Sequence, residues 1–113
     1  MSNKSKITEA PPAAVEEALK RLGNNLRTAR LRRHLRIVDI AERIGISRFT
    51  VSDLEKGKPG ASAAAYFGAL WALGLLDQTQ ELADPDHDEE GKILESARSP
   101  KEAPRRRSID NDF

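Results

Sequence analysis

The sequence predicts an all-α protein with four to five helices packed within residues 13–83. Apolar side chains recur there at intervals of three and four residues, which is the spacing of amphipathic helices. No segment shows the strict alternation of a β-strand, and the sequence contains no internal repeat. The chain has 113 residues, of which 38% are hydrophobic and 33% are charged, enough apolar material for one compact core.

The first helix is expected to follow a polar N-terminal segment, residues 1–12, which is predicted to be flexible because it has little to bury. The pair Pro11–Pro12 favours a helix start, since the first turn of a helix does not need the N–H that proline lacks. From there to residue 33, apolar residues recur at the spacing of a helix. Gly23–Asn25 are poor helix formers. The segment is therefore either one long helix with a weak joint or two helices, the second from about Leu26.

Two short helices are predicted on either side of Gly45. The first runs from about Val38 to Ile44, and Gly45 ends it, because glycine readily adopts the left-handed conformation found just after a helix. Ser47 offers a hydroxyl N-cap for the second helix, from Arg48 to about Glu55. The inward-facing positions of the pair are Ile40, Ala41, Ile44, Val51 and Leu54.

A fourth helix is expected from Ala63 to Leu73, with Ser62 as its N-cap and Gly74 just beyond its end. Asp77 is expected to cap a short fifth helix that reaches about Ala83. The side chains that the fourth helix is predicted to bury are Tyr66, Phe67, Leu70 and Leu73.

Residues 84–113 form a tail that is first acidic and then basic. The tail contains few large apolar side chains, so it is predicted to be disordered in isolation apart from a short helix between about Asp88 and Ala97. Two interpretations of this tail remain open. It is either a solvated terminus or a segment that folds onto a partner, with Phe113 as one contact.

Basic residues are concentrated in one part of the chain. The whole protein has a formal net charge of only +1, but residues 26–58 hold nine basic and four acidic residues, a local net charge of +5. A compact basic segment in a nearly neutral chain indicates a binder of the phosphate backbone of nucleic acids.

Several function classes are excluded by composition. Without cysteine, the chain has no disulfide framework, thiol catalysis or cysteine-ligated metal site. His34 and His87 lie far apart without companions at ligand spacing, so no metal site is predicted. The sequence shows no catalytic set and no phosphate-binding glycine loop, so neither an enzyme nor a bound cofactor is expected. No stretch resembles a membrane helix or a signal peptide, which predicts a cytoplasmic protein.

The segment from Leu35 to Gly57 predicts a helix-turn-helix. Its two short helices are joined by the tight turn at residues 45–47, and the second presents polar side chains outward. In such a pair the first helix contacts the DNA backbone, and the second is narrow enough to enter the ~12 Å wide major groove.

Residues 26–83 resemble the helix-turn-helix domain of the lambda-repressor-like, Xre-type family. The residues that carry the resemblance are Leu31–Leu35, Ile40–Arg48 and Val51–Gly57. Tyr66–Leu76 together with Leu82–Asp86 resemble the antitoxin of hip-type toxin–antitoxin modules. The resemblance implies a dimeric autorepressor that binds a palindromic DNA operator, and an antitoxin that also holds a serine/threonine-kinase toxin inactive.

The resemblance assigns the base contacts to the exposed face of the helix after Ser47. These residues are Arg48, Phe49, Ser52 and Asp53. Their chemistry agrees, because arginine pairs with guanine, aspartate accepts from the cytosine amine, and phenylalanine contacts the thymine methyl. Two alternatives stay open: Phe49 packs into the core or a dimer contact, and Asp53 orients a nearby arginine.

Phosphate contacts are expected from basic and hydroxyl side chains around the two short helices, and these contacts fix the register on DNA without reading its sequence. They are Arg27, Arg32, Arg33, Arg36, Thr50, Lys56 and Lys58.

The sequence departs from the family pattern at the start of the first short helix. Arg36 and Ile37 replace the usual hydroxyl cap and glutamine, so a side-chain cap is predicted to be absent there. The resemblance also implies a partly buried ion pair between Arg30 and Glu55.

Apolar side chains that are not needed for the core are candidate contacts to a partner. They are Ile37, Trp71 and Phe113. Trp71 is alternatively a core residue. Two rival functions remain open. One is a stand-alone phage-like repressor without a toxin, and the other is a protein- or RNA-interaction module with Ile37 and Phe49 as apolar contacts.

Overall fold

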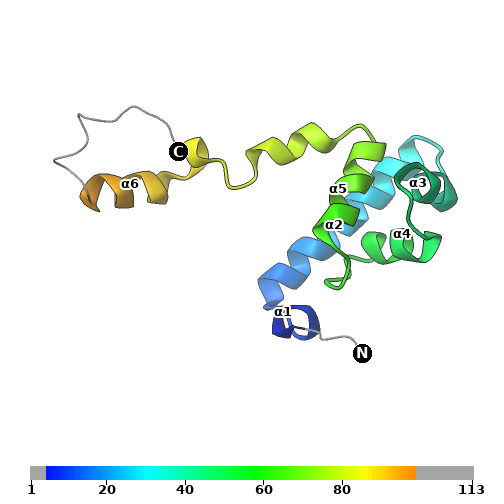
Figure 1. Ribbon diagram of the computed structural model, residues 1–113, viewed down its shortest axis with the longest axis horizontal. Coiled ribbons are helices and arrows are strands. Elements are labelled where there is room, and N and C mark those ends of the chain that lie inside the picture. Colours follow the sequence, from blue (N-terminus) through cyan, green and yellow to red (C-terminus); the bar gives the residue numbers. More distant parts are fainter. Residues whose placement is uncertain (1–4, 99–113) are drawn as a thin grey trace. The chain divides into compact units, whose positions relative to one another are not determined.

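The computed structural model describes residues 5–98, and every regular element in that range is helical (Figure 1), which confirms the all-α fold class. The chain divides after Asp77 into two compact units, which are described separately. In chain order the elements are α1 (Lys6–Glu9), α2 (Ala13–Arg32), α3 (Ile37–Ile44), α4 (Arg48–Glu55), α5 (Ala63–Ala72), the 3-10 helices η1 (Leu76–Glu81) and η2 (Pro85–His87), and α6 (Glu89–Arg98).

Helix α2 is continuous, which confirms the single-helix alternative. It follows Pro12 and passes through Gly23 without a break. Gly23 is buried against the end of α4, where a Cβ would lie 2.5 Å from the carbonyl oxygen of Leu54 and 2.7 Å from the backbone nitrogen of Gly57. Gly23 thus allows two backbones to approach closely, and this packing compensates for its low helix propensity.

Helices α3 and α4 form the predicted helix-turn-helix. Gly45 ends α3 with a φ of 74°, in the left-handed region, and its N–H donates to the carbonyl of Ala41. Ser47 Oγ then accepts a hydrogen bond from the N–H of Thr50 at 3.1 Å, which caps α4. Both expectations for this turn are confirmed.

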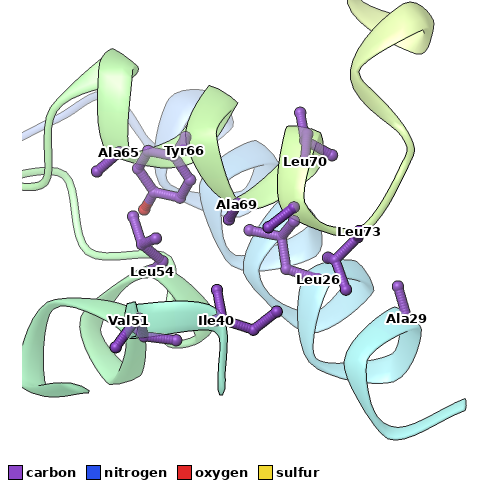
Figure 2. Packing of buried hydrophobic residues seen from close by; sticks show 12 residues of the cluster. Leu26, Ala29, Ile40, Val51, Leu54, Ala65, Tyr66, Ala69, Leu70 and Leu73 are labelled. Carbon is purple, nitrogen blue, oxygen red and sulfur yellow. The ribbon is translucent and has the colours of Figure 1, made fainter. Parts of the chain in front are cut away.

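The core of the first unit lies between α2, α3, α4 and α5 (Figure 2). Helix α4 packs against each of the other three. Leu54 is completely buried, and Ile40 and Val51 are each 2% exposed, so α4 is fixed mainly by two side chains spaced three residues apart.

Helix α5 contributes Tyr66, Leu70 and Leu73 to this core, as predicted, but Phe67 is 40% exposed and its predicted burial is wrong. Consecutive helical residues point about 100° apart. With Tyr66 turned inward, Phe67 faces outward, on the same side of α5 as Trp71, which is 57% exposed.

The element after α5 differs from the prediction. Gly74 follows α5 with a φ of 78°, as expected of a residue beyond a helix end, but the next element is a 3-10 helix that begins at Leu76. Asp77 therefore lies in its first turn and not at an N-cap. Helix η1 buries none of its residues, so it lacks the tertiary packing that usually sustains an α-helix.

In the second unit, the described residues 78–98 include η2 and α6. Asp84 caps η2 by accepting a hydrogen bond from the N–H of Asp86 at 2.9 Å, and Asp88 accepts from the N–H of Gly91 at the start of α6. Helix α6 confirms the predicted helix to within one residue at each end, and it leaves Ile93 and Leu94 exposed. Residues 99–113, including Phe113, lie outside the described residues.

Candidate nucleic-acid interface

Helix α4 presents the four predicted base-contact positions away from the core. With Val51 and Leu54 buried, Arg48 and Phe49 are exposed, and Ser52 and Asp53 are partly exposed. Phe49 is 70% exposed, so the alternative that it packs into the core of its own chain is wrong.

Arg48 and Phe49 contact each other on this face. The guanidinium carbon of Arg48 lies over the Phe49 ring, 5.3 Å from its centroid, a cation–π arrangement. Neither side chain makes a hydrogen bond or ion pair with another described residue, so the N–H groups of Arg48 remain available to a ligand.

Asp53 is partly exposed on α4. It has no ion pair with any described arginine, so the alternative that it orients one has no support in the structure. The pKa of Tyr66 is raised by burial and, to a smaller extent, by the negative charge of Asp53. The Tyr66 hydroxyl donates to the carbonyl of Lys58 at 2.8 Å. This hydrogen bond fixes the loop after α4 to helix α5.

The predicted phosphate contacts lie at the surface on three segments. Arg27 and Arg32 are exposed on α2, and Lys56 and Lys58 are exposed just after α4; none of the four has an ion pair within residues 5–98. Thr50 Oγ1 lies 3.0 Å from Ser47 Oγ at the start of α4.

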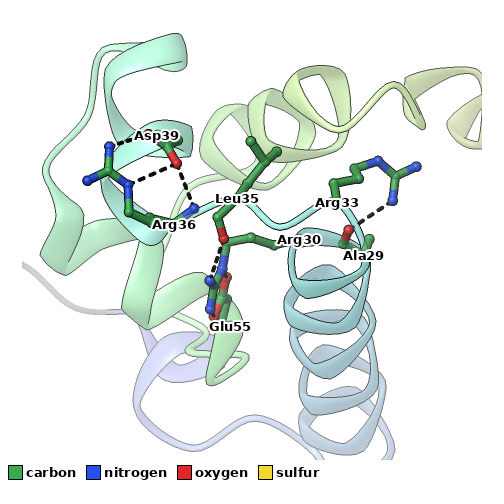
Figure 3. A network of polar contacts seen from close by, with 7 residues as sticks. All are labelled: Ala29, Arg30, Arg33, Leu35, Arg36, Asp39 and Glu55. Atoms are coloured by element: carbon green, nitrogen blue, oxygen red, sulfur yellow. Dashed lines mark hydrogen bonds and ion pairs between the residues drawn. The ribbon is translucent and has the colours of Figure 1, made fainter.

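The remaining two arginines of this set make contacts within the protein (Figure 3). Arg33 Nη1 donates to the carbonyl of Ala29 at 2.9 Å, at the C-terminal end of α2. Arg36 Nη2 donates to Asp39 Oδ1 at 2.9 Å. A phosphate bound by Arg36 would therefore have to compete with Asp39 for the guanidinium.

The predicted absence of a side-chain cap at the start of α3 is confirmed, but Asp39 makes a hydrogen bond there that was not predicted from the sequence. No side chain accepts at the Arg36 N-cap, but Asp39 Oδ2 accepts a hydrogen bond from the backbone N–H of Arg36 at 2.7 Å. This is one half of a capping box, with aspartate in place of the usual glutamate. The hydrogen bond from the Arg36 side chain, together with the one from its backbone, lowers the pKa of Asp39. A carboxylate three residues after the N-cap is a signal that sequence reasoning missed.

Arg30 and Glu55 form the expected ion pair, and it joins three segments (Figure 3). Arg30 Nε and Nη2 donate to the two carboxylate oxygens of Glu55 at 2.6 and 3.0 Å, and Nη1 donates to the carbonyl of Leu35 at 3.0 Å. Both side chains are 9% exposed. The hydrogen bond to Glu55 raises the pKa of Arg30 despite its burial. The pair fixes α4 to α2 and to the segment before α3.

The candidate partner contacts differ in exposure. Ile37 is partly buried against the core, so it is not the exposed residue that the sequence suggested. Trp71 is exposed, and the alternative that it belongs to the core is wrong. Trp71 lines a shallow, mostly apolar groove together with Arg43, Ile44, Phe67, Gly68 and Leu76.

Within the described residues, no three His, Asp or Glu side chains gather in a way that could hold a metal ion. No helix in that same part of the chain is both long enough and apolar enough to cross a membrane.

Comparison with known proteins identifies the domain. Residues 21–83, more than half of the chain, match the family model of a helix-turn-helix domain. The matched range covers the C-terminal half of α2 and all of α3, α4 and α5. Neither the curated proteins nor the solved structures gave a match. On this match and on the geometry of α3 and α4, the chain belongs to the helix-turn-helix domain family.

Proposed function

We propose that this protein is a sequence-specific DNA-binding autorepressor that acts in the cytoplasm as a dimer on a palindromic operator. The observation that carries the proposal is the outward face of α4, where Arg48, Phe49, Ser52 and Asp53 project from a helix that the core holds in place. Membership of the helix-turn-helix family supports a DNA-binding regulator.

In this proposal α4 enters the major groove. Arg48 donates to guanine O6 and N7, Asp53 accepts from the cytosine amine, and Phe49 contacts a thymine methyl. Ser52 donates to or accepts from a neighbouring base edge. Each well-placed bidentate pair contributes ~1–3 kcal/mol of discrimination against the wrong base.

The basic residues around α4 supply the affinity that does not depend on sequence. We assign phosphate contacts to the unpaired cations Arg27, Arg32, Lys56 and Lys58, to Thr50, and to Arg33 and Arg36 once they exchange their internal partners. Two copies on a two-fold symmetric operator place two such helices about one DNA turn, ~34 Å, apart. The second contact multiplies the selectivity of the first.

The test is binding of the full chain to the DNA upstream of its own gene, measured by fluorescence anisotropy at two salt concentrations against a scrambled duplex. We expect selective binding that weakens as salt rises. Arg48→Ala should reduce the selectivity, whereas Lys92→Ala, which replaces an exposed lysine of α6, should leave it unchanged. Equal affinity for the operator and the scrambled duplex would contradict the proposal. It would favour the protein- or RNA-interaction module.

The apolar groove beside α5 favours a second function, that of an antitoxin for a hip-type kinase. Trp71 and Phe67 are 57% and 40% exposed, and large aromatic side chains at a surface are typical anchors of protein–protein contacts. The test is to search for a kinase gene next to the gene of this protein and to co-express the kinase with this chain. We expect the native chain to restore growth and Trp71→Ala to fail while it still binds DNA. Without a toxin gene or rescue, the protein is a stand-alone repressor.

A further inference from the structure

The contact between Arg48 and Phe49 has a consequence for the DNA sequence that α4 selects. The two residues are consecutive, both are exposed, and the guanidinium of Arg48 lies over the Phe49 ring. The aromatic face occupies one side of the guanidinium and leaves its N–H edge available, which is the edge that pairs with guanine.

The distance between the two groups limits which bases they reach together. The guanidinium carbon lies 5.3 Å from the ring centroid. Successive base pairs are about 3.4 Å apart, so two steps span about 6.8 Å. Groups closer than two steps reach the same or adjacent base pairs when they project into the major groove side by side.

We propose that Arg48 and Phe49 act as one reading unit that selects a guanine directly next to a pyrimidine carrying a C5 methyl group. This inference rests on the proposed DNA-binding function. Thymine is the ordinary base with that methyl group, and 5-methylcytosine presents the same group at the same position of the groove. Phe49 has no hydrogen-bonding atom, so the methyl group is the feature of a base edge that it contacts favourably.

The experiment begins with the full chain and a library of DNA duplexes with a randomised centre, from which bound sequences are selected. In the selected duplex, each thymine is replaced in turn by deoxyuridine, which removes the methyl group alone. We expect one replacement, next to a guanine, to weaken binding about fourfold, the effect of one buried methyl group. Replacing the neighbouring guanine by 7-deazaguanine should weaken binding about tenfold. A duplex with 5-methylcytosine at the same pyrimidine position should bind about fourfold more tightly than a duplex with cytosine there, again the effect of one methyl group.

Variants then assign the effect to the pair. Phe49→Ala should bind the thymine and deoxyuridine duplexes equally, and Arg48→Ala should lose the guanine preference. Phe67→Ala removes an exposed phenylalanine from α5 and should keep the full methyl effect. The deoxyuridine measurement uses the native protein, so it does not depend on how well the variants fold.

Three results overturn the inference while the proposed function stands. They are a selected site without a thymine beside a guanine, equal binding of every deoxyuridine duplex, and a methyl effect that persists in Phe49→Ala. Selection of no sequence at all overturns the proposed function and the inference with it.

Discussion

The Arg30–Glu55 pair makes a large and specific prediction about stability. Glu55→Gln keeps the size of the side chain but removes the charge that balances the buried guanidinium of Arg30. Two charge-assisted hydrogen bonds, at 2.6 and 3.0 Å, are affected, and each contributes ~1.5–3 kcal/mol. The glutamine oxygen can still accept one of them. We therefore expect a loss of about 3 kcal/mol, the lower end for breaking a buried ion pair.

The assay is thermal and urea unfolding followed by helical circular dichroism. In a domain of this size, a loss of about 3 kcal/mol lowers the melting temperature by about 12 °C or more. Glu16→Gln is the matched control, because it removes the same charge from the exposed Lys20–Glu16 pair, whose N–O distance is 3.6 Å. Its effect should stay within about 0.5 kcal/mol. A Glu55→Gln variant as stable as this control would refute the reasoning.

A double variant separates the ion pair from the burial of its two side chains. Arg30→Met combined with Glu55→Leu replaces both charged groups by apolar groups of similar volume. Exchanges of this kind in buried pairs are often neutral or stabilising, whereas removal of one partner leaves an unbalanced charge. We expect the double variant to be more stable than either single variant. A loss equal to the sum of the single losses would show that the two residues do not interact.

The remaining predictions concern packing, pH and salt. Gly23→Ala should destabilise the fold by ~1–3 kcal/mol in urea unfolding, because its Cβ would meet the backbone of α4, although alanine is the better helix former; a more stable variant would contradict this packing. Arg36 lowers the pKa of Asp39 in the folded chain, so the pair stabilises the fold above the unfolded value of about 3.9 and loses this effect as the pH falls through the folded pKa. The native chain should accordingly have a higher urea midpoint than Asp39→Asn at neutral pH, and this difference should disappear in acid. A difference independent of pH would argue against the pair. Lys56→Ala should weaken binding to all duplexes about equally and reduce the slope of log affinity against log salt by about 1, whereas Lys92→Ala should leave the slope unchanged.

Local signals account for the parts of the fold that the sequence predicted well. The turn between α3 and α4 needs a left-handed residue at Gly45 and a hydroxyl at Ser47, and both signals lie within three residues of what they determine. The outward face of α4 could be predicted because Val51 and Leu54, three residues apart, lie on one side of the helix. With that side turned into the core, the orientation of the helix is determined. The Arg30–Glu55 pair was predicted only through the family resemblance, since the two residues are 25 positions apart.

The prediction was wrong where the signal was weak or depended on distant residues. Helix α5 carries small or apolar side chains almost all round, so its hydrophobic pattern does not single out a buried face, and Phe67 was placed on the wrong side. Gly23 indicated a weak joint because its helix propensity is low, while its packing partner lies more than 30 residues further along the chain. Asp39 was missed because aspartate replaces the glutamate or glutamine of the usual capping pattern.

The way α4 is held has a consequence for how a protein of this kind changes over evolutionary time. The side chains that hold the helix, Val51, Leu54 and Glu55, are separate from the four that face outward, Arg48, Phe49, Ser52 and Asp53. Surface substitutions of this kind usually change stability by less than about 0.5 kcal/mol, whereas core substitutions cost several times more. Duplicated copies of the gene can therefore diverge in the outward residues without unfolding. Under the proposed function, exchange of these four side chains redirects one scaffold to a new DNA sequence.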